Sequence, residues 1–312
     1  MHLKQLNKTI HMRRFPNTLL GVPMVCILML CILASCSIQQ KLSKNLDSRV
    51  LQNKNLENAH VGVSIVDLGN QKQLFSYQAD KYFVPASNTK IFTCYAAMKF
   101  LGDSVTGIEY SEDDTAIYLI PSGDPTFLHQ DFADQPVIRF LQRATKPLYI
   151  TDVNWNDKAL GSGWSWDDYS SSYMAERSPL PVYGNVIRWV QEQNEKAPGG
   201  NNEMDQGAVT YSIPEVNWRV KFSADQRRKA FSVSRDKDDN VFTIVEGPEA
   251  KKEQQVPFIT RGLGSAVELL PDTLGKAIVQ LDKSEARFTN VRTIFSRPMD
   301  SLLRPMMQNS DN

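Results

Sequence analysis

The most informative stretch of the chain is VPASNTKIFT, residues 84–93, which joins an extended segment to a helix. Pro85 ends the extended segment, and apolar residues then recur at helical spacing until Gly102, which is expected to stop the helix. Ser87 and Lys90 are three residues apart in the first turn, so both side chains can project from one face. A partly desolvated lysine can accept the proton of a serine hydroxyl. This makes Ser87 a candidate nucleophile and Lys90 its candidate base.

The spacing S-x-x-K is a weak signal by itself, since serine and lysine are both common. A second copy, Ser234 to Lys237, falls in a charged run with no apolar helix after it, and we expect a solvated turn there. For the first copy, the alternative interpretation is a serine that only caps the helix beside an exposed lysine.

Composition indicates a folded protein without a polyanionic partner. The 312 residues are 41% hydrophobic and 22% charged, and 35 basic residues balance 35 acidic ones. Nucleic acid is therefore not an expected partner. Only Cys94 lies outside the first 36 residues, so a disulfide scaffold is excluded. His60 and His129 have no partners at zinc-ligand spacing, and we expect neither a metal nor a cofactor.

Residues 1–36 have the pattern of a bacterial export segment. Four basic residues and no acidic ones accompany an apolar run, which ends in Leu33-Ala34-Ser35-Cys36. This ending resembles a lipobox, which implies lipidation of Cys36 and a membrane-anchored protein on the periplasmic side of the cell envelope. A transmembrane anchor is the alternative, but the run of about 15 residues is short of the roughly 20 needed to span a bilayer. Residues 37–57 are polar and are expected to form a tether.

The remaining chain predicts a mixture of strands and helices. Alternating apolar residues over Val61–Val66 and Gln73–Tyr77, separated by a tight turn, predict a β-hairpin. Further short strands are predicted at Thr115–Ile120, Leu148–Val153, Ala208–Ile213, Asn217–Phe222 and Val241–Val245. Short helices are predicted at Val137–Gln142 and Val186–Gln193, and loops at 162–173 and 196–206.

Residues 84–93, with the hairpin before them, resemble the penicillin-binding D-alanyl-D-alanine carboxypeptidases and endopeptidases, in the class with a large insertion after the nucleophile helix. The resemblance covers about residues 58–312. Its other matching segments are SGDPT at 122–126, YGN at 183–185, and PMDSLLRPMM at 298–307 running into SDN at 310–312. It implies an α+β serine-transferase fold, shared by penicillin-binding proteins and β-lactamases, with an antiparallel sheet and helices.

The resemblance also implies roles for individual residues. Ser87 would form an acyl-serine intermediate with a peptidoglycan stem peptide, and β-lactams would be covalent inhibitors. Ser310 would relay protons near Lys90 and the leaving amine, and the Asn312 amide would bind the substrate backbone. No cofactor is implied.

The interval between the two motifs predicts an inserted domain. From position 90 to position 310 is 220 positions, more than a minimal domain of this class needs. We expect a catalytic domain formed by residues 58–102 and about 247–312, with a β-rich inserted domain at about 103–246.

One expected element does not occur. The resemblance implies a Lys-Thr-Gly or His-Thr-Gly on an edge strand that contributes to the oxyanion hole, and the sequence contains neither. We therefore expect a C-terminally shortened copy whose catalytic activity is in doubt. The alternatives are a non-catalytic, lipid-anchored peptidoglycan-binding protein and a β-lactamase, against which the long insertion argues.

Overall fold

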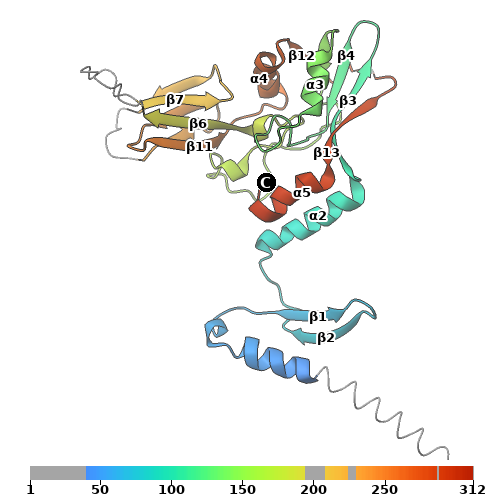
Figure 1. Cartoon of the computed structure of the whole chain (residues 1–312), viewed down its shortest axis with the longest axis vertical. Coiled ribbons are helices and arrows are strands. Elements are labelled where there is room, and N and C mark those ends of the chain that lie inside the picture. The colour runs from blue at the N-terminus through green and yellow to red at the C-terminus, as the bar shows by residue number, and fades with distance from the viewer. Residues whose placement is uncertain (1–39, 194–207, 224–229, 287, 312) are drawn as a thin grey trace, which may run out of the picture. The chain divides into compact units, whose positions relative to one another are not determined.

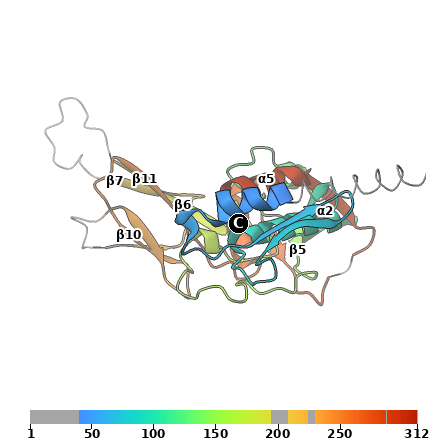
Figure 2. The ribbon, with the colours of Figure 1, turned by 90° about the horizontal axis from the view of Figure 1, so that it is seen from below.

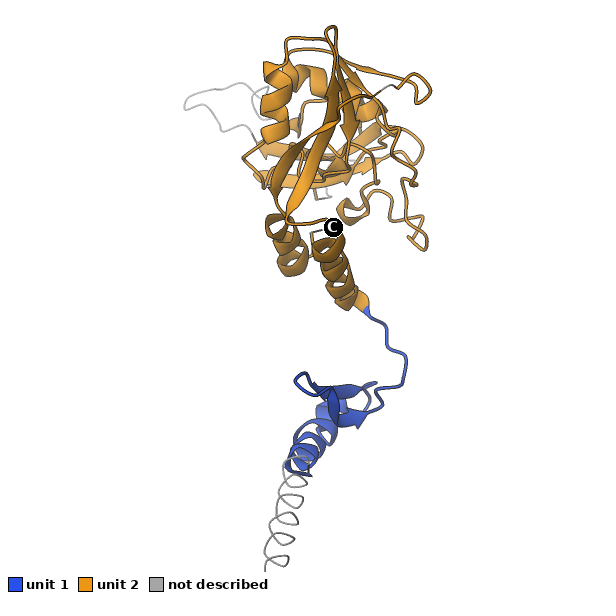
Figure 3. Ribbon diagram, turned by 90° about the vertical axis from the view of Figure 1, so that its right-hand side faces the viewer, with its two compact units in different colours: residues 1–85 blue, residues 86–312 orange. Residues whose placement is uncertain are grey.

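The structure is a computed structural model that describes residues 40–193, 208–223, 230–286 and 288–311. Cys36, the loop expected at 196–206 and Asn312 lie outside the described residues. The chain divides into two compact units, Met1–Pro85 (unit 1) and Ala86–Asn312 (unit 2), shown in Figure 3. Within the described part, no helix is both long and apolar enough to cross a membrane.

The described part of unit 1 begins with a helix at residue 40. Residues 40–46 are α-helical and continue into a π-helical turn, η1 (Asp47–Leu51), followed by a short 3-10 turn, η2 (Lys54–Leu56). The polar tether expected over residues 37–57 is therefore helical over most of its described length.

The β-hairpin of unit 1 confirms the alternation seen in the sequence. Its strands, β1 (Val63–Asp67) and β2 (Lys72–Tyr77), pair in the antiparallel sense. The Asp67 carboxylate accepts the backbone N–H two residues on at 2.8 Å, and the Asn70 amide oxygen does the same at 2.9 Å. These side-chain bonds fix the tight turn.

Unit 2 opens with the helix predicted from Ser87. A 3-10 turn, η3 (Ala86–Asn88), leads into α2 (Thr89–Phe100), which lies beside the last helix, α5 (Met299–Asn309), in Figure 1. The contact is an apolar cluster formed by Val105, Met299 and Leu303, with Cys94, Ala97, Leu302 and Met306 packed beside it.

A five-stranded sheet lies above this helix pair in Figure 1. Its strands are β3 (Ser104–Glu112), β4 (Ile117–Pro121), β5 (Leu148–Ile150), β12 (Ile278–Gln280) and β13 (Arg292–Pro298), in the order β12-β5-β4-β3-β13. β3 pairs antiparallel with β4 and β13, but β5 pairs parallel with both neighbours. The sheet is mixed rather than purely antiparallel because α3 (Pro136–Arg143) forms a crossover between β4 and β5.

Two three-stranded sheets complete unit 2. One contains β6 (Val186–Gln193), β7 (Ala208–Ile213) and β11 (Lys251–Pro257), with β6 in the centre. The other contains β8 (Arg219–Phe222), β9 (Ser232–Arg235) and β10 (Val241–Val245), with β10 in the centre. Figure 2 shows β7, β10 and β11 together at one end of this unit.

The helix predicted at Val186–Gln193 is wrong, because this segment is strand β6. It is rich in β-branched and aromatic residues, which suit a strand that is covered on its faces. Ile187 and Trp189 are almost completely buried, and β7 and β11 pair with β6 on its two edges. The partners that determine this strand are supplied by distant segments.

The solvated turn expected at Ser234–Lys237 is wrong for its first half. Ser234 lies in β9, and the neighbouring Arg235 is 4% exposed. Its guanidinium donates to the Pro257 carbonyl at 2.8 Å and lies 5.3 Å from the Tyr169 ring. Burial lowers the pKa of Arg235, while the nearby Glu176 carboxylate opposes this shift. The arginine therefore anchors β9 to the core.

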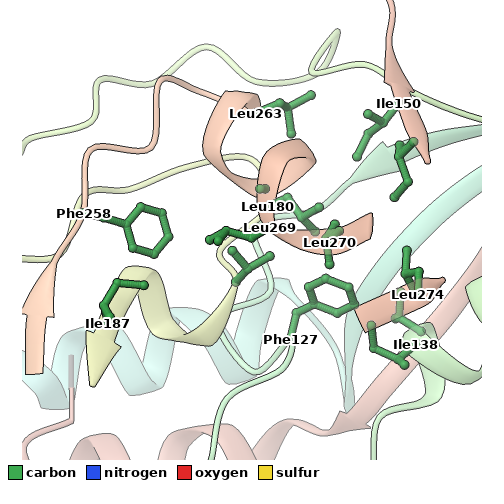
Figure 4. Close-up of a cluster of buried hydrophobic side chains, with 14 of the residues drawn as sticks. Phe127, Ile138, Ile150, Leu180, Ile187, Phe258, Leu263, Leu269, Leu270 and Leu274 are labelled. Atoms are coloured by element: carbon green, nitrogen blue, oxygen red, sulfur yellow. The ribbon is translucent and has the colours of Figure 1, made fainter. Parts of the chain in front are cut away.

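The main core packs the sheets against α3 and α4 (Gly264–Leu274). Figure 4 shows Phe127, Leu180 and Leu270 in its centre. Strands β12 and β13, which follow the expected return to the catalytic domain, pair in the same sheet as β3 to β5. The insert boundaries at about 103 and 246 remain predictions.

Candidate active site

Ser87 and Lys90 face each other at the start of α2. Ser87 lies in η3 and is exposed, whereas Lys90 lies in the first turn of α2 and is half-buried. A long hydrogen bond of 3.4 Å joins Lys90 Nζ to Ser87 Oγ. The first turn of the helix therefore brings an amine next to a hydroxyl, as the spacing predicted.

The residue before the candidate nucleophile has an unusual backbone conformation. Ala86 has a φ of 43°, in the left-handed region that favours glycine. Such conformations persist only where the surrounding chain holds them, and they concentrate at functional sites. Here the left-handed residue turns the chain directly into the helix start that carries Ser87.

In the helix pair of the apolar cluster, α5 begins where α2 ends. The Met299 N–H at the start of α5 donates to the carbonyl of Asp103, just past the end of α2, at 2.8 Å. The helices contain 12 and 11 residues, so each extends about 16 to 18 Å from this point. Because the helices lie side by side, the first turn of α2 and the last turn of α5 are at the same end of the pair, as Figure 1 shows. Ser87 precedes α2 and Ser310 follows α5, so both lie at that end.

Ser310 caps the C-terminus of α5. It has φ 56° and ψ 34°, a left-handed conformation, and is exposed. The following N–H, of Asp311, donates to the Pro305 carbonyl at 3.4 Å. Among the described residues, no hydrogen bond joins Ser310 to Lys90 or Ser87. The proton relay expected of Ser310 remains a prediction.

The SGDPT segment is a turn in which Asp124 and Thr126 are buried, and it is hydrogen-bonded to the chain just before α5. One oxygen of the buried Asp124 carboxylate accepts from the Thr126 N–H at 2.9 Å and from its hydroxyl at 2.7 Å. Arg297 lies in β13, two residues before α5, and donates from Nε to Thr126 Oγ1 at 2.8 Å. Burial lowers the pKa of Arg297, and the charges of Asp124 and Asp134 oppose the shift. These contacts tie the SGDPT segment to β13 and hence to α5.

The YGN segment forms a 3-10 turn, η5 (Tyr183–Asn185), whose three residues all have positive φ. The buried Asn185 side chain accepts from the Val182 N–H at 3.2 Å and donates to the Glu176 carbonyl at 2.8 Å. A Cβ on Gly184 would lie 3.0 Å from Cδ2 of His129. Glycine therefore allows this turn to approach the imidazole closely.

Folding also creates a cluster that spacing did not predict. The side chains of His129, Asp131 and Asp311 lie with their ligating atoms within 4.8 Å of one another. Three such groups could hold a metal ion, but no other feature of the described residues points to one. The sequence gives no signal for this cluster, since Asp311 reaches His129 only through the packing of α5.

A search of family models and known proteins gives consistent matches. The model of the D-Ala-D-Ala carboxypeptidase 3 (S13) family matches residues 42–312. A D-alanyl-D-alanine carboxypeptidase from Actinomadura sp. (strain R39) is 29% identical over 154 residues, which are 46% of this chain and 28% of that protein. The chain therefore spans less than a third of this curated relative.

Among solved structures, penicillin binding protein 4 from Haemophilus influenzae matches with a TM-score of 0.53 at 16% sequence identity. The match covers 80% of this chain and 59% of that one. At this identity the likeness concerns the fold, and it confirms the α+β fold expected from the sequence.

Proposed function

The chain belongs to the D-Ala-D-Ala carboxypeptidase 3 (S13) family, and on that premise we propose that it is a serine-type D-Ala-D-Ala carboxypeptidase or endopeptidase acting on peptidoglycan stem peptides. The observation that carries the proposal is the 3.4 Å hydrogen bond from Lys90 Nζ to Ser87 Oγ at the start of α2. A β-lactamase is less well supported, because the family match over residues 42–312 is to carboxypeptidases.

In the proposed reaction, Ser87 Oγ attacks the carbonyl carbon between two D-alanine residues while the neutral Lys90 amine accepts the hydroxyl proton. Amide groups at the helix N-terminus favour the negative charge that develops on the carbonyl oxygen. The C–N bond then breaks, the proton passes from Lys90 to the departing D-alanine amine, and an acyl-serine remains. A water molecule, deprotonated by the same amine, hydrolyses this ester and restores the serine hydroxyl.

Ser310 and Asn312 have supporting roles in this proposal. Ser310, at the end of α5 on the same side as Ser87, would carry the proton between Lys90 and the leaving amine. The Asn312 amide would hydrogen-bond the substrate backbone. β-Lactams would acylate Ser87 as they resemble the substrate amide, and the reaction requires no cofactor.

We also propose a place for the protein in the cell envelope. Acylation of the Cys36 thiol would anchor the chain to a membrane, because each acyl methylene buried in the bilayer contributes roughly 0.8 kcal/mol to the free energy of membrane binding. The proposed active site would then lie on the periplasmic side, where its peptidoglycan substrate is. Exchange of Cys36 for alanine should release the protein from the membrane fraction, whereas unaltered retention would exclude this anchor.

A fluorescent penicillin tests the catalytic proposal. The full chain should form a covalent adduct that survives denaturation, and Ser87→Ala should abolish it. Ser234→Ala is the matched control, because it removes the serine of the other S-x-x-K copy, and it should label like the unaltered chain. Absence of an adduct in the folded, unaltered chain would instead favour a non-catalytic, lipid-anchored peptidoglycan-binding protein.

A further inference from the structure

Residues 126–135, here called the bracket loop, lie beside the residues that flank α5. Before the helix, Arg297 of β13 donates to Thr126 Oγ1 at 2.8 Å and to the Asp134 carbonyl at 3.3 Å. After the helix, the His129 imidazole lies within 4.8 Å of the Asp311 carboxylate, measured between their ligating atoms. One short loop is therefore hydrogen-bonded to the chain before an 11-residue helix and lies close to the residue that follows its cap.

The bracket loop is fixed internally by one side chain. The amide nitrogen of Gln135 donates to the carbonyls of Thr126, at 3.0 Å, and Phe132, at 2.8 Å. Its amide oxygen accepts from the Leu128 N–H at 3.0 Å. These three bonds cross-link the loop, so that it can act as a rigid support.

The His129 ring is itself held in place. Its Nδ1 accepts from the Asp131 N–H at 3.3 Å, and its centroid lies 5.6 Å from the Phe132 ring. The ring also lies close to Gly184, where a Cβ would come within 3.0 Å of its Cδ2 atom. The imidazole therefore presents a fixed surface to the end of α5.

The end of α5 needs such support. Ser310 is exposed and adopts a left-handed backbone that a non-glycine residue holds only where its surroundings over-determine it. The next side chain, Asp311, is in the His129 cluster. We propose that His129 is a positioning residue that holds Asp311, and thereby Ser310, at the end of the helix pair where Ser87 and Lys90 lie. Only the catalytic consequence of this inference rests on the proposed function.

Hydrogen–deuterium exchange tests the positioning role without reference to activity. In the full chain, His129→Ala should speed exchange in the peptide covering residues 305–311 about five-fold or more, while the unfolding temperature stays the same. Asp311→Asn should have a similar effect, and the double variant should add little, since both changes act on one pair of neighbouring side chains. His129→Gln, which keeps a donor of similar reach, should restore part of the protection.

Asp134→Asn is the matched control, because it neutralises a carboxylate of the same loop whose side chain pairs with Arg139 rather than with α5. It should leave exchange at 305–311 unchanged. Unchanged exchange in His129→Ala, or fully additive effects in the double variant, would overturn the inference.

Penicillin acylation then tests the catalytic consequence. In a chain that forms the adduct, His129→Ala should lower the acylation rate constant about ten-fold while the affinity of the preceding complex changes little. An unchanged rate constant alongside faster exchange would overturn this consequence. If the unaltered chain forms no adduct, the proposed function fails, and the exchange measurements still decide whether His129 positions α5.

Discussion

Ala86, with a φ of 43°, precedes the candidate nucleophile, and Ser310, with a φ of 56°, follows α5. Tyr183 and Asn185 of the YGN turn also have positive φ. A left-handed conformation costs a non-glycine residue roughly 1 kcal/mol or more, so each of these positions is retained at the expense of stability. Positive φ also occurs outside the segments that carry the resemblance, at Gln78, Leu128, Arg261 and Asn290, so this strain accompanies the candidate site without identifying it.

Replacing Ala86 with glycine should relieve this strain. Ala86→Gly should raise the free energy of unfolding by up to about 1 kcal/mol, because glycine enters the left-handed region without a Cβ clash. Thermal unfolding followed by circular dichroism measures the change. A valine at the same position should lower stability, and equal stabilities of all three chains would contradict the strain argument.

Lys90 should be far more important than the other lysine of α2. Lys90→Met should slow penicillin acylation by about 10²- to 10⁴-fold, the range typical of a lost general base. Lys99→Met is the control, since the Lys99 ammonium contacts only the Tyr95 hydroxyl and the Phe100 and Tyr95 rings among the described residues. Equal rates in the two variants would show that Lys90 is not the base.

At the scale of elements, Asp113 fixes the β3–β4 turn. Its carboxylate accepts from the Thr115 N–H and hydroxyl, both at 2.7 Å, and from the Ala116 N–H at 2.9 Å. The hydrogen bonds from Thr115, followed by that from Ala116, lower the pKa of Asp113 to about 2 from an ordinary value of 3.8. The ionised form is therefore the one that the folded turn favours.

This depressed pKa predicts an acid-sensitive turn. The stabilisation should be complete above pH 4 and be lost as the pH falls through about 2, where the folded state takes up the proton. Asp113→Ala should lower the unfolding temperature at pH 7, and the difference from the unaltered chain should shrink between pH 4 and pH 2. Asp114→Ala, which removes the adjacent carboxylate and leaves the Asp113 hydrogen bonds in place, is the control for the effect at pH 7.

The strand β10 depends on one buried aromatic side chain. Phe242 is fully buried, with its ring 5.0 Å from Trp189 of β6 and 6.0 Å from Trp218. Phe242→Ala should lower the free energy of unfolding by about 3–5 kcal/mol, because it leaves a cavity between two sheets. Chemical denaturation measures this value, and a loss below 1 kcal/mol would show that the cavity collapses.

The local sequence pattern correctly predicted the elements that are determined by residues close together in the chain. The hairpin with its Asp67 and Asn70 turn and the helix after Ser87 follow from residues close in sequence. The helix prediction for β6 is wrong because buried and exposed positions do not alternate along its eight residues. Val190 and Gln191, for example, are consecutive and both buried. A central strand covered on both faces lacks the two-residue alternation of apolar and polar side chains, so its pairing with distant segments determines its conformation.

At the scale of the whole molecule, α2 leaves much apolar surface uncovered in unit 2. On one face of α2, Cys94 and Ala97 pack into the cluster with α5. Phe92, Tyr95 and Met98 are 72%, 61% and 65% exposed. A helix that is apolar on most of its faces is usually covered on them. Such a surface favours association with other apolar groups.

This surface should be detectable in solution. Unit 2 by itself, residues 86–312, should bind a dye such as anilinonaphthalene sulfonate and scatter more light as its concentration rises, because exposed apolar side chains associate. The double variant Phe92→Gln, Met98→Gln should reduce both signals. Phe222→Gln, on the exposed strand β8, is the control and should change them little. Equal signals in both variants would contradict this prediction.

The sequence predicted the members of the candidate site unevenly. Ser87 and Lys90 share one helical turn, so their contact follows from spacing alone. The approach of Asp311 to His129 depends on how α5 packs, and no local pattern encodes that. Residues brought together by tertiary packing need the folded chain before they can be recognised.

The junction between the end of α2 and the start of α5 limits how this protein can evolve. The Met299–Asp103 hydrogen bond fixes where α2 ends and α5 begins, so the lengths of the two helices decide how Ser310 and Ser87 line up. Inserting a single residue into either helix would rotate everything beyond it by about 100° and shift it by about 1.5 Å. Codon insertions or deletions should therefore be eliminated from these two helices while they accumulate in the irregular stretch at 151–171.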